Sequence, residues 1–96
     1  MAVAVRKHIE TLSDDELQEM LRRDYLRRLI RYKKTDELMR QKYGMTYEEF
    51  VNRNVVAEQN LSWEVESDSQ DWEMALDGVR KMKRNLSEID GYSHTN

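Results

Sequence analysis

Two helix-start signals of the same design divide this chain, and a glycine lies just before the second of them. Ser13 and Glu16 form a capping box, in which the serine hydroxyl can accept from the amide three residues on while the glutamate reaches back. Thr46 and Glu49 repeat the pattern. Gly44 supplies the residue type that most readily adopts the left-handed conformation at which helices end. These signals predict a long N-terminal helix, a helix corner at Gly44 and a new helix directly after it.

Hydrophobic spacing predicts the remaining elements. The first helix should run from 14 to about 43, and the second, shorter helix from 47 to about 58. Apolar and acidic residues alternate over 61–66, which is typical of an extended linker. A C-terminal amphipathic helix should then begin at a cap among residues 67–69 and end at Gly91, because apolar residues recur there every three or four positions. The expected fold class is therefore all-α.

Length and composition indicate a single helical domain over residues 1–96, with flexible tails at 1–12 and 91–96. There is no cysteine, so neither a disulfide framework nor a thiolate zinc site is expected. The apolar stretch at the N-terminus meets Arg6 and Lys7 at once, which is too short for a signal-peptide core or a membrane span. We expect a cytoplasmic protein that does not enter a membrane.

The charges are strongly segregated along the chain. Between residues 22 and 34 seven positive side chains meet one acid, and between 48 and 77 nine acids meet only one arginine, although the net charge is only −3. Opposite fields on one small surface can steer charged macromolecules without any catalytic group. The basic residues at helical spacing, for which nucleic acid is a candidate ligand, are Arg23, Arg27, Arg31 and Lys34. Alternatively, this stripe is an ordinary solvated face, since Glu19 can pair with Arg23.

Two apolar residues of the first helix project away from its core face. Leu26 and Ile30 lie roughly opposite the apolar stripe at 100° per residue, and a helix of about 30 residues is longer than a lone small domain can cover. These two residues are the candidates for oligomerisation. A homodimer that packs its long helices antiparallel is the simplest arrangement, and a heteromeric partner is the alternative.

No arrangement of residues points to catalysis, a metal or a cofactor. The two histidines, His8 and His94, lie in the terminal segments, and the chain has no Gly-rich phosphate loop and no His/Cys cluster with ligand spacing. We therefore expect a protein that is not an enzyme and acts by binding.

The acidic and aromatic segment is the main candidate for partner binding. Trp72 is expected in the core, whereas Trp63 has two open interpretations, a core residue or an anchor in a partner's pocket. The candidate partner-binding residues are Trp63, Glu64, Val65, Glu66, Asp68, Asp71 and Glu73.

The stretch KYGMTYEEF, followed after a gap by WEVESDSQDWEMAL, is similar to a pattern in short, mostly uncharacterised prokaryotic proteins. These proteins resemble the antitoxins of two-gene toxin–antitoxin modules. The similarity covers about Lys42 to Leu76, and it departs from the pattern at Ser69, where an aromatic residue is expected. The resemblance implies an antitoxin that neutralises a co-encoded toxin by binding. A nucleic-acid-binding transcriptional regulator and a structural homo-oligomeric scaffold are the alternatives.

Overall fold

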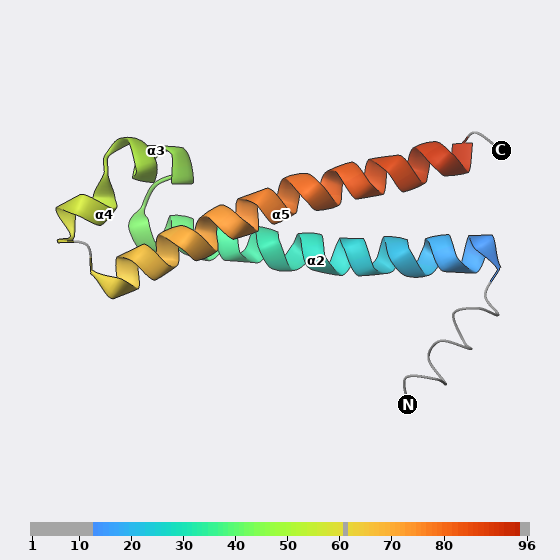
Figure 1. Cartoon of the computed structure of the whole chain (residues 1–96), viewed down its shortest axis with the longest axis horizontal. Coiled ribbons are helices and arrows are strands. Elements are labelled where there is room, and N and C mark those ends of the chain that lie inside the picture. Colours follow the sequence, from blue (N-terminus) through green and yellow to red (C-terminus); the bar gives the residue numbers. More distant parts are fainter. Residues whose placement is uncertain (1–12, 61, 95–96) are drawn as a thin grey trace, which may run out of the picture.

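The computed structural model describes residues 13–60 and 62–94, and every regular element in that part of the chain is a helix. The long helices are α2 (Asp14–Tyr43) and α5 (Trp63–His94), and the short ones are α3 (Tyr47–Asn52) and α4 (Val55–Glu58). α2 and α5 form an antiparallel hairpin, and α3 and α4 lie at the end where α2 stops and α5 begins (Figure 1). The predicted all-α class and the order of its long helices are confirmed.

The predicted caps and corner are present. The Ser13 hydroxyl accepts from the backbone N–H of Glu16 at 3.1 Å, and the Thr46 hydroxyl accepts from that of Glu49 at 3.2 Å. Gly44 has φ 69° and ψ 25°, and its N–H donates to the carbonyl of Arg40. The stop and the two starts are thus made by local hydrogen bonds, as short-range patterns allow.

The second helix is interrupted, where a single helix to about residue 58 was predicted. α3 ends at Asn52, and Asn54 adopts a left-handed conformation with φ 55° before α4 begins at Val55. Asparagine tolerates this conformation better than most residues, so the chain can turn here without glycine. The turn lets both Phe50 and Val55 enter the core, with 1% and 6% of their surface exposed.

The prediction of an extended segment over 61–66 is wrong for most of its length, because α5 already begins at Trp63. The helix start is capped by Ser62, whose hydroxyl accepts from the N–H of Val65 at 3.3 Å. Residues 67–69, predicted to cap the helix, lie inside it. Val65 and Trp72 are two turns apart and both buried, so the apparent alternation is the first turn of the helical stripe.

The predicted helix end at Gly91 is also wrong, since α5 continues to His94. Gly91 does not have the positive φ that Gly44 has, and so it does not terminate the helix. Residues 91–94 therefore belong to α5, whereas the rest of the expected tails, 1–12 and 95–96, lies outside the described residues.

The core is an aromatic cluster at the closed end of the hairpin. Trp72 is fully buried, and its ring centroid lies 5.2 Å from that of Phe50 and 5.3 Å from that of Tyr47. Tyr43 completes the cluster, 4.9 Å from Phe50. The Trp72 indole N–H donates to Asp36 Oδ1 at 2.8 Å, so this buried polar atom is satisfied. The cluster joins α2, α3 and α5 at one end.

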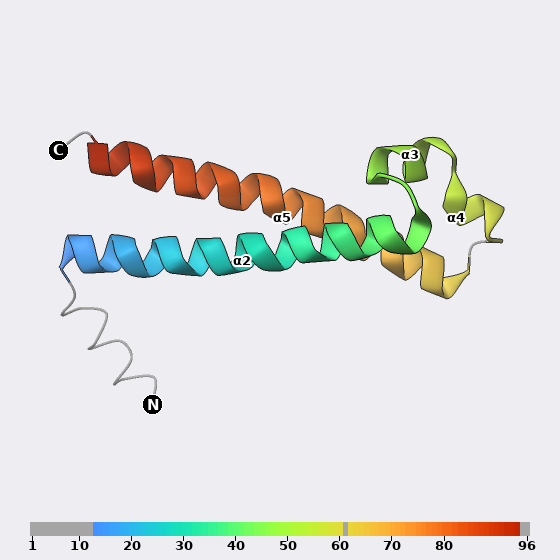
Figure 2. The ribbon, with the colours of Figure 1, turned by 180° about the vertical axis from the view of Figure 1, so that it is seen from behind.

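Away from this cluster the hairpin is thin. Arg22 and Asp90 form an ion pair near its open end, where α2 starts and α5 finishes (Figure 2). Halfway along, the ring of Tyr32 packs directly on Gly78. No residue of α2 is buried, and the molecule measures 54 × 35 × 16 Å. Its radius of gyration is 18.4 Å, against about 12 Å for a compact domain of this length.

Candidate protein-binding site

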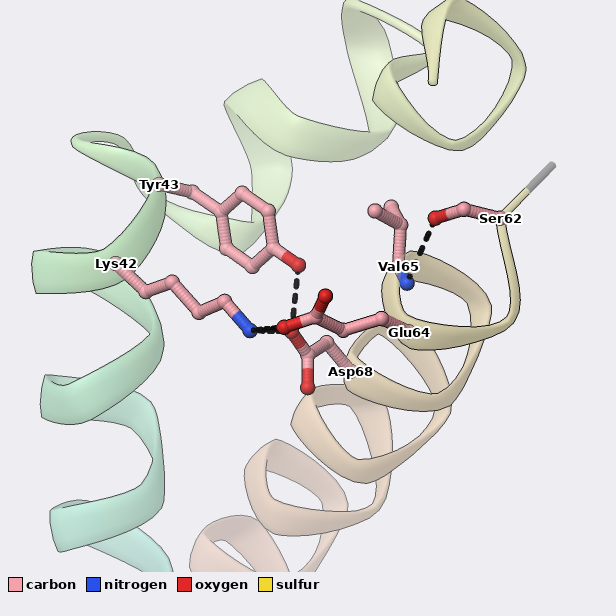
Figure 3. A network of polar contacts seen from close by, with 6 residues as sticks. All are labelled: Lys42, Tyr43, Ser62, Glu64, Val65 and Asp68. Atoms are coloured by element: carbon pink, nitrogen blue, oxygen red, sulfur yellow. Dashed lines mark hydrogen bonds and ion pairs between the residues drawn. The ribbon is translucent and has the colours of Figure 1, made fainter. Parts of the chain in front are cut away.

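Where the hairpin closes, a polar network joins the last turn of α2 to the first turns of α5 (Figure 3). The Lys42 ammonium contacts Glu64 Oε1 at 2.8 Å and Asp68 Oδ2 at 2.6 Å. The Tyr43 hydroxyl donates to the same Asp68 oxygen at 2.6 Å. Glu64 and Asp68 are one helical turn apart, so both carboxylates face α2 from one side of α5. The network fixes the start of α5 against the end of α2.

The network shifts the pKa values of Lys42, Tyr43 and Asp68. Hydrogen bonds to Asp68 and then to Glu64 raise the pKa of Lys42 well above its ordinary value. Partial burial, followed by the hydrogen bond to Asp68, raises the pKa of Tyr43 to about 12. Partial burial alone would raise the pKa of Asp68. Hydrogen bonds from Lys42 and Tyr43 outweigh this effect, so the pKa is lowered. These shifts favour the charged forms of both Lys42 and Asp68 at neutral pH.

Trp63, the first residue of α5, lies beside this network and points into solvent. Its exposed fraction is 81%, the highest among the exposed large hydrophobic residues of the described chain. Its neighbours fix its position, because the Ser62 cap starts the helix and Glu64 is bound to Lys42. Of the two interpretations of Trp63, a core position is therefore wrong.

The other residues predicted to bind a partner divide into two groups. Val65 belongs to the core with 8% exposed, and Glu64 and Asp68 are engaged by Lys42, so the structure uses these three to hold α5 in place. The remaining acids have no ion pair within residues 13–60 and 62–94: Glu66 is half-buried, whereas Asp71 and Glu73 are exposed.

Sequence reasoning missed Lys42 and Tyr43 as partners of this segment. The available signal was the spacing of Glu64 and Asp68 by four residues, which places two acids on one helical face. Their cation could not be identified, because it lies on a helix whose register against α5 depends on tertiary packing.

All four residues of the predicted basic stripe on α2 are exposed. Arg23 pairs with Glu19 at 3.1 Å, and the Arg27 Nε donates to the Arg23 carbonyl at 3.5 Å. Arg31 and Lys34 form no ion pair with any described residue. Of the four residues only Arg23 is ion-paired, so Arg27, Arg31 and Lys34 carry positive charge that no described acid neutralises.

The candidates for oligomerisation are both exposed, Leu26 at 39% and Ile30 at 67%. The helical neighbours of Ile30 at three and four positions' distance are Leu26, Arg27, Lys33 and Lys34. This apolar spot is therefore surrounded by cations.

Within the described residues, no group of histidine, cysteine, aspartate or glutamate side chains is arranged to hold a metal ion. In the same part of the chain, no helix combines the length and the apolar character that crossing a membrane requires. His8 lies outside that part, and the side chain of His94 is not among those described.

Comparison with known proteins finds no matching family model, no matching curated protein and no matching solved structure.

Proposed function

We propose that this protein is an antitoxin-like binding protein, which neutralises a co-encoded toxin by covering a basic surface of it. The observation that carries the proposal is Trp63, because a large aromatic side chain that is 81% exposed on a fixed helical turn is a typical interface anchor. Because so little of its surface is buried, Trp63 contributes little to the stability of the hairpin itself.

Charge defines the kind of partner. No lysine or arginine occurs between Arg53 and Arg80, while Glu66, Asp71 and Glu73 lie on the same helix as Trp63 without ion pairs to described residues. A positively charged partner, such as the substrate surface of an enzyme that acts on RNA, would be attracted to this helix. Neutralisation then follows from occlusion of that surface, with no reaction at the binding protein.

The two groups of predicted residues have different roles in this proposal. Val65, Glu64 and Asp68 place α5, and contact with the toxin falls to Trp63 with Glu66 and Glu73. The acids should mainly raise the association rate, and Trp63 should mainly slow dissociation.

The test is binding of the purified product of the adjacent gene, measured by calorimetry at low and at moderate salt. Trp63→Ala should weaken the complex at least about tenfold. Val51→Ala is the matched control, since Val51 is an exposed apolar residue on α3, and it should leave the affinity unchanged. No complex at low salt, or equal affinity of the wild type and Trp63→Ala, would argue against the proposal.

A second candidate function is nucleic-acid binding by Arg23, Arg27, Arg31 and Lys34, favoured because Arg27, Arg31 and Lys34 form no ion pair with a described residue. It predicts DNA affinity that falls steeply with salt and is lost when the four charges are reversed. The two functions are compatible, because they use different helices. A structural homo-oligomeric scaffold, the third alternative, would respond to neither assay and would show self-association only.

A further inference from the structure

An apolar groove runs between α2 and α5 on one face of the hairpin. It has a volume of about 430 Å³, and its lining includes Tyr32, Met39 and Ala75. Leu38 and Met74 line it from the two helices and remain 51% and 69% exposed. Neither side chain belongs to the hydrophobic core of the described residues, so this groove is a candidate contact surface.

The hairpin alone covers α2 poorly. This helix has 30 residues and an apolar stripe, yet none of its residues is buried. The molecule is only 16 Å across in its thinnest direction, so residues 13–60 and 62–94 provide no second layer over the groove. A macromolecule seated on the groove would supply that layer.

The charges around the groove indicate what the second layer is. Arg31 lines it from α2 and Asp71 from α5, and neither has an ion pair with any described residue. A surface with an apolar centre, one free cation and one free anion is complementary to itself. In a twofold-symmetric interface every contact occurs twice. If Arg31 of one copy meets Asp71 of the other, the symmetry axis creates a second, equivalent ion pair.

We propose that this groove is the interface of a homodimer, in which Leu38 and Met74 of two copies pack together and Arg31 of each copy pairs with Asp71 of the other. The interface differs from the one predicted at Leu26 and Ile30. A twofold contact centred on Ile30 would bring Arg27, Lys33 and Lys34 of both copies together, and like charges disfavour such a contact.

The test is the dimer dissociation constant of the full chain, measured by sedimentation over a dilution series. Arg31→Asp and Asp71→Arg should each raise this constant at least about tenfold, and the double variant should restore it to within about threefold of the wild type. A failure of the double variant to restore association would show that the two residues do not pair.

Two further variants separate this interface from the alternative. Met74→Asp should raise the dissociation constant at least about tenfold, whereas Ile30→Asp should not change it, although the two residues are almost equally exposed at 69% and 67%. Because both side chains are exposed, both variants should fold, which circular dichroism checks. A wild type that remains monomeric at the highest soluble concentration, or a dimer that Ile30→Asp disrupts and Met74→Asp does not, would overturn the proposal.

Discussion

Replacement of Gly78 by alanine should destabilise this protein, against the usual trend for a glycine inside a helix. Alanine is normally better than glycine there by about 1 kcal/mol, because glycine loses more backbone entropy on folding. A Cβ at position 78, however, would lie 2.5 Å from Tyr32 Cδ2, 2.6 Å from Cε2 and 2.8 Å from Cγ. Ordinary carbon–carbon contacts are about 3.5–4.0 Å.

The clash cannot be relieved at the tip of a flexible side chain. Cγ is the first ring atom of Tyr32, so the whole ring has to move or α2 has to separate from α5. Overpacking of this kind costs about 1–3 kcal/mol. After the gain in helix propensity is subtracted, Gly78→Ala should lower the free energy of unfolding by about 1 kcal/mol, with an upper limit of about 2.

Gly91→Ala is the matched control, because Gly91 lies on the same helix and a Cβ there would meet nothing within 4 Å. It should raise the free energy of unfolding by about 0.5 kcal/mol, less than in mid-helix because it lies near the end of α5. Urea unfolding followed by circular dichroism, at one fixed protein concentration, gives both values. In a Tyr32→Ala background the penalty at position 78 should disappear. Two results would show that the helices do not meet at Tyr32 and Gly78. In the first, Gly78→Ala is as stable as the wild type; in the second, it lowers the free energy of unfolding by the same amount with and without the Tyr32 ring.

Three further outcomes are expected. Tyr43→Phe should lower the free energy of unfolding by about 1 kcal/mol through loss of the hydrogen bond to Asp68. The difference in phenolate absorbance between the wild type and this variant, which reports Tyr43 alone, should titrate near pH 12 rather than near 10. A midpoint near 10 would contradict the burial of that phenol. Because the folded-state pKa of Asp68 is lowered, its contribution to stability is complete above the ordinary carboxyl pKa and is lost as the pH falls through the folded-state pKa. Asp68→Asn should therefore lose less stability in acid than the wild type does. Acid unfolding curves that run parallel for the two proteins would refute this. Thr46→Ala should lower the free energy of unfolding by about 1 kcal/mol, because it removes the cap of α3. Ser87→Ala, at an exposed site inside α5, should not lower it. Equal effects of the two substitutions in urea unfolding would show that the cap does not contribute.

The candidate site could be predicted only in part. Trp63 and its acids were recognisable as a group because they are neighbours in the sequence. The sequence did not show which of these residues face a partner, because this depends on the rotation of α5 about its own axis. The cap of α5 is Ser62, six positions before Asp68, the acidic residue among the predicted caps, and that earlier start places Val65 inside and Trp63 outside.

The same limit applies to the groove. Leu38 and Met74 are 36 positions apart, and Arg31 and Asp71 are 40 apart. No local pattern shows that these residues line one surface, since their proximity follows from the alignment of two separate helices.

The sequence by itself determined the helix boundaries at Ser13, Gly44 and Thr46, because capping hydrogen bonds and the left-handed turn involve residues at most four positions apart. It also determined that Trp72 enters the core. Tertiary structure alone decided that Lys42 binds Glu64 and Asp68, and that Tyr32 rests on Gly78. Those contacts depend on the register between α2 and α5, which the aromatic cluster at the closed end of the hairpin fixes through packing across long distances in sequence.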